Sequence, residues 1–275
     1  MTIDEVKRKF GLTNIIKLAS NENPAGPSPL AIKYLTEHLK KSHRYPDSYA
    51  FKLRNKLADL YNLEIDNVIL GGGSEGIMSV IMRTFLHDDD EIVAVQNSFI
   101  GFRVLANASG IKTNWVPMKE FHYDLAGLAT QITNKTKIIY LANPDNPTGT
   151  YFNKSMFDNF MNSVPDRVLV ILDEAYFEYA QHLDDFPDSM LYRYDNVITL
   201  RTFSKAYGLA GLRVGYGFGH KELIDSLMKV KLPFEPSSPG QLAAFASLDD
   251  LDFLSNTIKN NTLGMKKLLN SLESY

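Results

Sequence analysis

The 275-residue sequence contains no cysteine. This absence excludes disulfide bonds, thiolate metal ligands and a cysteine nucleophile, and it is compatible with a reducing compartment. The sequence also has no apolar run that approaches the roughly 20 residues of a membrane-spanning helix. Its N-terminus, Met1 to Glu5, is acidic and lacks the apolar core of a signal peptide. We therefore expect a soluble, cytoplasmic protein that does not associate with a membrane.

The sequence carries little net charge, with a formal value of −3 at pH 7 and a pI near 6.1. This balance gives no electrostatic reason to expect binding to nucleic acid. Hydrophobic residues make up 44% of the chain, which is enough for a substantial core and argues against global disorder. The length predicts about one to two domains.

Short aliphatic runs alternate with helical patterns along most of the chain. Strands are expected at 67–70, 91–95, 137–141, 168–172, 197–200 and 214–218. Helices are expected at about 29–40, around 53–61 and 77–85, around Phe102, twice between 218 and 248, and in one long segment from about 251. Residues 18–29 are dense in turn formers and are expected to form an extended arm. The alternation predicts an α/β fold with a mostly parallel sheet.

The stretch 202–213 concentrates reactive side chains directly after an expected strand. Lys205 therefore lies on a loop at the carboxyl end of that strand, where open α/β sheets bind ligands. A lysine there can form a Schiff base with an aldehyde cofactor if its amine is at least partly neutral. Thr202, Ser204 and Arg213 add two hydroxyls and a guanidinium that suit a phosphate. Together they suggest pyridoxal phosphate, although a lone lysine is also compatible with a solvated surface position.

Three other strand ends carry glycine, aromatic or amide residues. The run Gly71 to Ile77 leads from a strand into a helix, so Gly73 and Ser74 could present backbone N–H groups to an anion. A tight turn without a ligand explains this run equally well, and it matches no nucleotide-binding motif. Phe99 could stack on a flat cofactor, but core packing is the commoner role of phenylalanine. Asn146 lies in a proline-rich, rigid loop and could donate to an oxygen anion.

A carboxylate, Asp173, directly follows the most aliphatic expected strand, residues 168–172. Burial of a carboxylate is costly unless it meets a cation or a strong donor. A metal ion is one option, but the six histidines do not gather near Asp173 and no second carboxylate loop presents itself. A protonated pyridine nitrogen is the better partner, and no metal is expected.

These segments resemble the class I/II aminotransferases of fold type I, and most closely the histidinol-phosphate aminotransferases. The matching elements run in the family's order over nearly the whole chain, at 18–29, 45–47, 72–77, 143–149, 173–176 and 201–215. The resemblance implies a three-layer α/β/α fold with a mostly parallel central sheet, which is the large domain of fold type I enzymes that use pyridoxal 5'-phosphate. The motifs are highly specific for the superfamily and less specific for the substrate.

The resemblance also implies roles for individual residues. Lys205 is the catalytic residue, which binds the cofactor covalently and moves a proton during the reaction. Asp173 pairs with the pyridine N–H group, and Phe99 stacks on the ring. Asn146 and Tyr176 bind the phenolate oxygen of the cofactor.

At the phosphate end of the cofactor, the resemblance assigns Thr202, Ser204 and Arg213, together with the backbone of Gly73 and Ser74. The protein's part in this chemistry is to bind, orient and tune the cofactor.

Two further positions concern the substrate and a neighbouring subunit. Tyr45 would reach the phosphate of the neighbouring subunit's cofactor, so a homodimer is expected. Asn23 and Tyr45 are the implied substrate-binding residues. The implied small-molecule partners are an amino donor and 2-oxoglutarate.

The resemblance divides the chain into an N-terminal arm and small-domain segment (1–35), a cofactor-binding large domain (36–250) and a long interdomain helix (251–275). The family continues beyond this length into a C-terminal domain whose arginines grip the substrate, so the small domain is expected to be incomplete. We expect cofactor binding to persist and substrate orientation to weaken severely. Ala25 stands where histidinol-phosphate enzymes often carry a bulkier side chain, which leaves other amino donors open.

The leading expectation is transfer of the amino group of L-histidinol phosphate to 2-oxoglutarate in histidine biosynthesis. An aromatic amino-acid aminotransferase or a threonine-phosphate decarboxylase would keep the same cofactor residues. From a different class, a catalytically idle cofactor-binding fragment or assembly subunit would bind the cofactor without converting an amino donor. A hydride-transferring Rossmann enzyme is disfavoured because the chain lacks the GxGxxG motif and its acidic ribose ligand.

Overall fold

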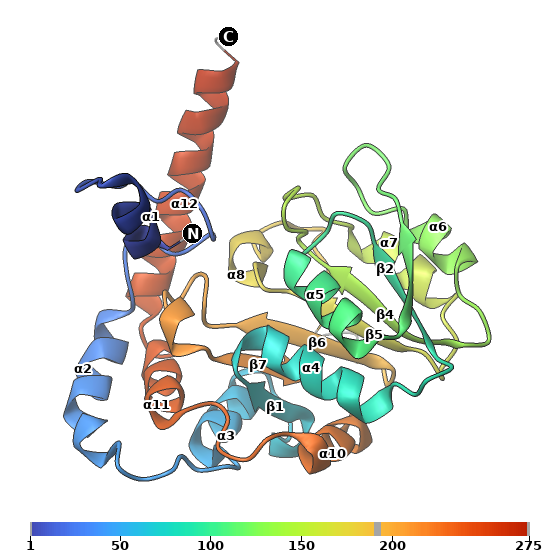
Figure 1. The fold of residues 1–275 in the computed structure, drawn as a ribbon, viewed down its shortest axis with the longest axis horizontal. Coiled ribbons are helices and arrows are strands. Elements are labelled where there is room, and N and C mark those ends of the chain that lie inside the picture. Colours follow the sequence, from blue (N-terminus) through green and yellow to red (C-terminus); the bar gives the residue numbers. More distant parts are fainter. Residues whose placement is uncertain (1, 190–193, 274–275) are drawn as a thin grey trace.

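The computed structural model describes residues 2–189 and 194–273, which contain a seven-stranded sheet (Figure 1). The order of strands across the sheet is β1-β7-β6-β5-β4-β2-β3. The strands are β1 (Val68–Gly71), β2 (Glu91–Val95), β3 (Lys112–Val116), β4 (Thr136–Ala142), β5 (Leu169–Asp173), β6 (Val197–Thr202) and β7 (Gly215–Phe218). Among these strands, β7 runs antiparallel to both of its neighbours, β1 and β6, and the other neighbouring pairs are parallel. The mostly parallel sheet expected from the sequence is confirmed.

Helices precede, connect and follow the strands. They are α1 (Ile3–Phe10), α2 (Pro29–His38), α3 (Phe51–Leu60), α4 (Gly73–Phe85), α5 (Ile100–Ser109), α6 (Leu125–Thr130), α7 (Lys154–Met161), α8 (Phe177–Ala180), α10 (Lys221–Val230), α11 (Ser238–Ser247) and α12 (Leu251–Leu272). Short 3-10 helices η1, η2 and η3 span Leu39–Lys41, Ile65–Asn67 and Ala210–Leu212. Within the described ranges, no helix is long and apolar enough to cross a membrane.

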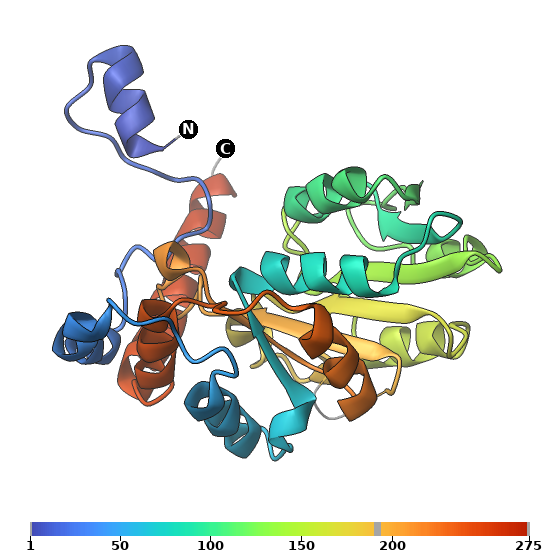
Figure 2. The ribbon, with the colours of Figure 1, turned by 60° about the horizontal axis from the view of Figure 1, so that its bottom comes forward.

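The sheet is the middle layer of three, as the alternation of its side chains requires. On β1, Ile69 packs into the core cluster that includes residues of α4 and α10. Its neighbours Val68 and Leu70 point to the other face and pack with residues of α3 and α11. Figure 2 shows helices above and below the strands, with α4 and α5 on one side and α3 and α7 on the other. The expected three-layer α/β/α fold is confirmed.

Several elements lie outside the sequence expectations, namely the strand β3 and the helices α1, α6, α7 and α8. The strand β3 is polar and only partly buried because it forms an edge of the sheet, so Lys112–Val116 lacks the aliphatic pattern of the other strands. The helix α1 was not expected inside the N-terminal arm. Its signals are a capping box formed by Thr2 and Glu5, and Gly11 in a left-handed conformation at its end.

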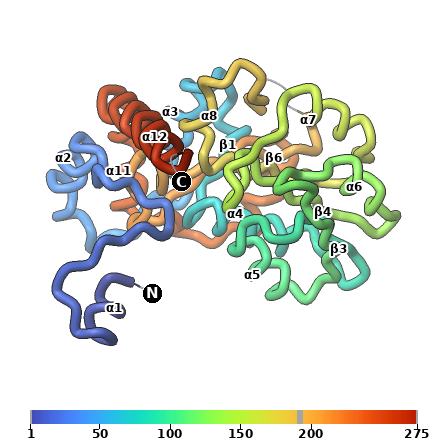
Figure 3. Tube along the Cα trace, turned by 90° about the horizontal axis from the view of Figure 1, so that it is seen from above, coloured from blue at the N-terminus to red at the C-terminus, as the bar shows by residue number. Residues whose placement is uncertain are grey.

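The arm and the last helix project from the body of the protein. The helix α12 extends away from the sheet, and α1 lies at the end of the arm, apart from the strands (Figures 1 and 3). Residues 12–27 of the arm have no regular helix or strand, as expected. In α12, Thr257 is buried, whereas Leu263, Leu268 and Leu272 are about half exposed. The expected domain boundaries stay predictions, and Met1 and residues 274–275 lie outside the described residues.

Candidate active site

A cavity of about 720 Å³ opens at the carboxyl ends of β4, β5 and β6. Parallel strands end at the same edge of a sheet, so their following loops converge there. All ten residues expected to contact the cofactor within one subunit line this cavity, namely Gly73, Ser74, Phe99, Asn146, Asp173, Tyr176, Thr202, Ser204, Lys205 and Arg213. Residues of the arm, Ser20, Asn21 and Glu22, complete its wall. The expected residues are therefore brought together by the fold.

Lys205 lies at the wall of this cavity, where β6 has ended. Its Nζ donates to the backbone oxygen of Ser20 at 3.1 Å and lies 5.5 Å from the centre of the Tyr176 ring. Partial burial lowers the pKa of the Lys205 amine, and the nearby Arg213 adds to this effect while Asp173 opposes it. A lowered pKa increases the fraction of neutral amine, which is the form that can attack an aldehyde.

Asp173 is the last residue of β5 and is 4% exposed. Its Oδ2 accepts a hydrogen bond of 2.9 Å from the hydroxyl of Tyr140. Its Oδ1 is buried and has no hydrogen-bond partner among the described residues. Burial raises the pKa of Asp173 to about 7, while the hydroxyl of Tyr140 and, to a smaller extent, the nearby backbone N–H of Ala175 oppose this effect. An unpartnered acidic oxygen at the wall of a cavity fits the protonated nitrogen of a pyridine ring.

Another part of the cavity carries groups that can bind an anion. The helix α4 begins at Gly73, whose φ of 80° favours glycine and whose added Cβ would lie 2.7 Å from Nη2 of Arg213. The hydroxyls of Thr202 and Ser204 lie 3.0 Å apart, and Nη1 of Arg213 lies 3.5 Å from Oγ of Ser204. Backbone N–H groups at a helix N-terminus, two hydroxyls and a guanidinium fit a phosphate. Nη2 of Arg213 is 3.2 Å from Oε2 of Glu75.

The loops that carry Phe99 and Asn146 are joined by a hydrogen-bond network. The hydroxyl of Ser98 donates to Oδ1 of the buried Asp145 at 2.5 Å, and Tyr123 donates to the same oxygen at 3.2 Å. The other oxygen of Asp145 accepts from the backbone and the side chain of the threonine that follows Pro147. The network fixes the backbone on which the ring of Phe99 and the amide of Asn146 reach the cavity.

The arm closes the cavity near Tyr176. Nδ2 of Asn21 donates to the hydroxyl of Tyr176 at 2.8 Å. The next asparagine, Asn23, does not line the cavity. Its Nδ2 donates instead to the backbone oxygen of Ala206 at 3.0 Å and lies 3.2 Å from Oγ1 of Thr257. Asn23 therefore tethers the arm to the segment after Lys205, and its role in substrate binding stays a prediction.

Tyr45 is absent from the wall of this cavity. Its side chain is 80% exposed and stacks on Phe234, with ring centres 4.3 Å apart. It lines a separate cavity of about 530 Å³ between α2, α3 and α11. Within one chain, Tyr45 thus does not contact the cofactor site, and its expected role toward a neighbouring subunit stays a prediction.

A buried group of charges lies next to Asp173 along the chain. Nε of Arg201 donates to Oε2 of Glu174 at 2.8 Å, and both side chains are fully buried. Asp188 accepts from Arg201 at 3.1 Å. Glu178 is also buried, and burial raises its pKa to about 7. None of these side chains lines the cavity of Lys205.

Sequence reasoning did not identify the residues that support the site, which include Tyr140, Ser98, Tyr123, Asp145, Asn21 and Glu75. For Tyr140 the signal is a hydroxyl in the otherwise aliphatic second part of β4, two residues before the strand ends. Ser98 and Asp145 directly precede the expected Phe99 and Asn146, and both have side chains that can hydrogen bond. These signals become specific only when the sheet places the strand ends side by side.

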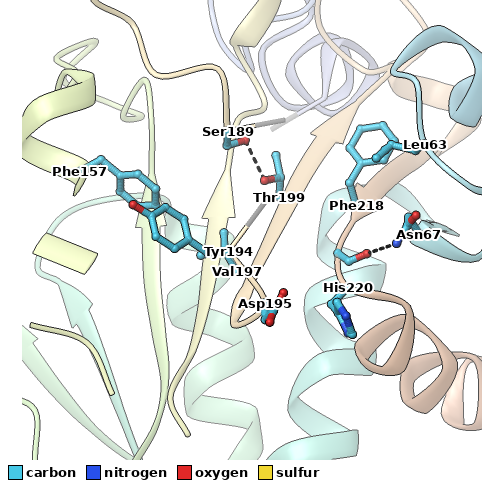
Figure 4. A pocket seen from close by; sticks show the side chains of 11 residues that line it. Leu63, Asn67, Phe157, Ser189, Tyr194, Asp195, Val197, Thr199, Phe218 and His220 are labelled. Atoms are coloured by element: carbon cyan, nitrogen blue, oxygen red, sulfur yellow. Dashed lines mark hydrogen bonds between the residues drawn. The ribbon is translucent and has the colours of Figure 1, made fainter. Parts of the chain in front are cut away.

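A smaller cavity of about 230 Å³ lies at the opposite edge of the sheet (Figure 4). It is lined by residues at the start of β6 and the end of β7, such as Val197 and Phe218, and by Tyr194 and His220. No expected site residue contributes to it. Across the described ranges, no group of three or more histidine or acidic side chains is arranged to hold a metal ion.

Comparison with known proteins gives one consistent family. Residues 13–274 match the family described as aminotransferase class I and II. Histidinol-phosphate aminotransferase 1 of Bacillus cereus is 41% identical over 99% of this chain and 74% of its own length. The crystal structure of histidinol-phosphate aminotransferase from Sinorhizobium meliloti in complex with pyridoxal-5'-phosphate superposes with a TM-score of 0.88, at 30% identity over 94% of this chain and 70% of that one.

The fold is shared more widely than the sequence. The crystal structure of L-threonine-O-3-phosphate decarboxylase from Porphyromonas gingivalis superposes with a TM-score of 0.74 at 19% identity, over 87% of this chain and 71% of that one. At this identity the likeness shows the fold alone.

Proposed function

The chain belongs to the class I and II aminotransferases, and within them to the histidinol-phosphate aminotransferases, and we propose on this basis that it transfers the amino group of L-histidinol phosphate to 2-oxoglutarate. The products are imidazole acetol phosphate and L-glutamate, and the reaction serves histidine biosynthesis. The observation that carries the proposal is the convergence of Lys205, Asp173 and the anion-binding end on one cavity.

The cofactor of the reaction is pyridoxal 5'-phosphate, which supplies an aldehyde and an electron-withdrawing ring when it is bound. Asp173, whose Oδ1 has no hydrogen-bond partner among the described residues, would keep the ring nitrogen protonated. Phe99 would pack against the ring, and Asn146 and Tyr176 would bind the oxygen on the ring. The backbone of Gly73 and Ser74, with Thr202, Ser204 and Arg213, binds the phosphate in the cradle described above.

Lys205 is the catalytic residue of the proposal. Its partly buried amine has a lowered pKa, so more of it is neutral and able to bond to an aldehyde. Nζ would also hold or move the proton at the Cα atom of the substrate. Ser20, whose backbone oxygen accepts from Nζ, and Asn21 form the side of the cavity from which the arm excludes water.

A homodimer is part of the proposal, because Tyr45 is exposed and lies outside its own chain's cavity. In that arrangement Tyr45 reaches the phosphate in the neighbouring subunit and, with Asn23, contacts the substrate. The cytoplasm is the location we propose, because the relatives' named reaction belongs to amino-acid biosynthesis. The proposed division at residues 35 and 250 separates the arm and α12 from the sheet that carries the site.

The test of the function is the absorption spectrum of the purified protein with pyridoxal 5'-phosphate, before and after one equivalent of L-histidinol phosphate. We expect the visible band of lysine-bound cofactor to convert to the pyridoxamine form. Lys205→Ala should show neither the band nor its conversion. Lys56→Ala removes another partly buried lysine, which bonds to Phe245 and Asp249 outside the cavity, and should behave as the unaltered protein.

Three results would contradict the proposal in different ways. A band that does not respond to L-histidinol phosphate but converts with an aromatic amino acid would move the reaction to an aromatic aminotransferase. Release of carbon dioxide from threonine phosphate would indicate the decarboxylase reaction instead. If no amino donor converts the band, the chain binds its cofactor without catalysing transfer.

A further inference from the structure

The hydroxyl of Tyr140 makes a hydrogen bond to the carboxylate of Asp173 from inside the sheet. Its oxygen lies 2.9 Å from Oδ2 of Asp173. Tyr140 is 1% exposed and does not line the cavity, so it cannot contact a ligand there. Its hydrogen bond gives it a route to the cofactor through Asp173.

The register of the sheet explains why the two side chains meet. Tyr140 is paired with Ile171, and Ala142 is paired with Asp173. Alternate residues of a strand share one face, so Tyr140 and Asp173 are diagonal neighbours on the same face of adjacent strands. A long side chain with a terminal hydroxyl spans that diagonal. A strand shifted by one residue would place the hydroxyl on the opposite face.

The ring of Tyr140 is itself held in place. Phe102 of α5 stacks on it with ring centres 3.9 Å apart and planes inclined by 9°. Burial raises the pKa of Tyr140 far above its ordinary value, so the phenol keeps its proton and acts as a donor. The carboxylate must then use Oδ2 to accept from Tyr140, which leaves the buried Oδ1 without a partner among the described residues.

We propose that Tyr140 is a positioning residue, which fixes the carboxylate of Asp173 so that Oδ1 faces the ring nitrogen of the cofactor. The proposal rests on the proposed function, because it requires a pyridine ring in the cavity. The hydrogen bond also favours the ionised carboxylate over the neutral acid and thereby opposes the effect of burial on Asp173. Tyr140 thus sets both the direction and the charge of the group that keeps the ring nitrogen protonated.

The test is Tyr140→Phe, which removes the hydroxyl and keeps the ring that stacks on Phe102. Dissociation constants are measured by equilibrium dialysis for pyridoxal 5'-phosphate and for its 1-deaza analogue, in which a C–H group replaces the ring nitrogen. We expect the variant to bind pyridoxal 5'-phosphate about tenfold more weakly, the effect of losing one hydrogen bond to a charged group. The analogue has no ring nitrogen for Asp173, so its binding should not weaken.

A second readout follows the ring nitrogen directly. In cofactor labelled with ¹⁵N in the ring, the bound nitrogen resonance of Tyr140→Phe should move toward that of the unprotonated pyridine. Tyr216→Phe is the matched control, because Tyr216 is also fully buried in the sheet but its hydroxyl lies 3.3 Å from that of Tyr61. It should leave both dissociation constants and the resonance unchanged.

Equal weakening for the cofactor and the analogue would overturn the proposal, since the hydroxyl would then matter only for packing. Unchanged binding and an unchanged resonance would overturn it as well, because Asp173 would hold the ring nitrogen without Tyr140. These outcomes differ from failure of the proposed function. A protein that binds the cofactor but does not convert L-histidinol phosphate would leave the inference standing, whereas an unaltered protein that binds neither compound would remove its premise.

Discussion

Asp173 and Glu174 are adjacent in the sequence, equally buried, and placed in opposite surroundings. Glu174 finds a cation within the chain, because Arg201 binds it at 2.7 to 2.8 Å inside the core. Asp173 receives only a neutral hydroxyl on one oxygen, and its other oxygen, like Oε1 of Glu174, has no hydrogen-bond partner among the described residues. Of the two residues, Asp173 lines the cavity and Glu174 does not. A carboxylate that supports the fold is neutralised by the fold, whereas one that serves a ligand is left for the ligand to neutralise. The predictions below test this difference.

Arg201→Met should have the largest effect, because it leaves Glu174 charged and unpaired in the core. We expect the free energy of unfolding to fall by about 3–5 kcal/mol, the usual result of removing one partner of a buried pair. Denaturant titration measures this loss. Arg83→Met, on a surface arginine that bonds to its own helix, is the control and should change little. Adding Glu174→Gln to Arg201→Met should recover part of the stability. Equal losses of stability in Arg201→Met and Arg83→Met would contradict the comparison.

Asp173→Asn should separate function from stability. Without the negative charge opposite the ring nitrogen, we expect the rate of the first half-reaction to fall by about a hundredfold, which is typical for loss of one electrostatic contact. The cofactor-free protein should be as stable as before or more stable above pH 7, because the variant no longer buries an unpaired carboxylate. Stopped-flow absorbance and denaturant titration give the two quantities. A large loss of stability would mean that Asp173 supports the fold as Glu174 does.

The stability of the cofactor-free protein should depend on pH through Glu178, which like Asp173 has a raised pKa. The folded chain keeps the proton of Glu178 up to about pH 7, whereas the unfolded chain releases it near 4.5. Stabilisation by this proton is therefore present at low pH and is lost as the pH rises from 4.5 to 7. The slope is about 1.4 kcal/mol per pH unit for one carboxyl group. Unfolding at several pH values should show a flatter dependence in Glu178→Gln, and parallel curves would contradict the assignment.

Ser98→Ala should have the smallest effect, and it tests the residues that support the cofactor cavity. It removes one donor to Asp145 and loosens the connection between the loops of Phe99 and Asn146. We expect a loss of about 1 kcal/mol in stability and a few-fold weaker binding of the cofactor. Ser109→Ala controls for the lost hydroxyl, because the Ser109 hydroxyl bonds only to nearby backbone, donating to Ala106 and accepting from Ile111. Identical cofactor affinity in both variants would show that the network does not reach the cofactor.

The sequence predicted the positions of the loops better than the contacts between them. Aliphatic runs predicted six strands. Because parallel strands end at the same edge of a sheet, the residues that follow them were expected to lie close together. The polar edge strand β3 was missed because an edge position removes the pressure for an aliphatic pattern. The bond from Tyr140 to Asp173 could not be predicted, because it depends on which strands are neighbours and on their register. Tyr123 reaches Asp145 for the same reason, through the order of the strands rather than through its local sequence.

The contact between the arm and Lys205 makes the site a product of the whole chain rather than of one segment. The bond from Lys205 to Ser20 joins positions 185 residues apart, and the bond from Asn21 to Tyr176 joins positions 155 residues apart. Closing loops of this length has an entropic cost that must be met before these contacts add stability. We therefore expect the sheet to assemble before the arm closes the cavity, and competence to bind the cofactor to appear after the secondary structure.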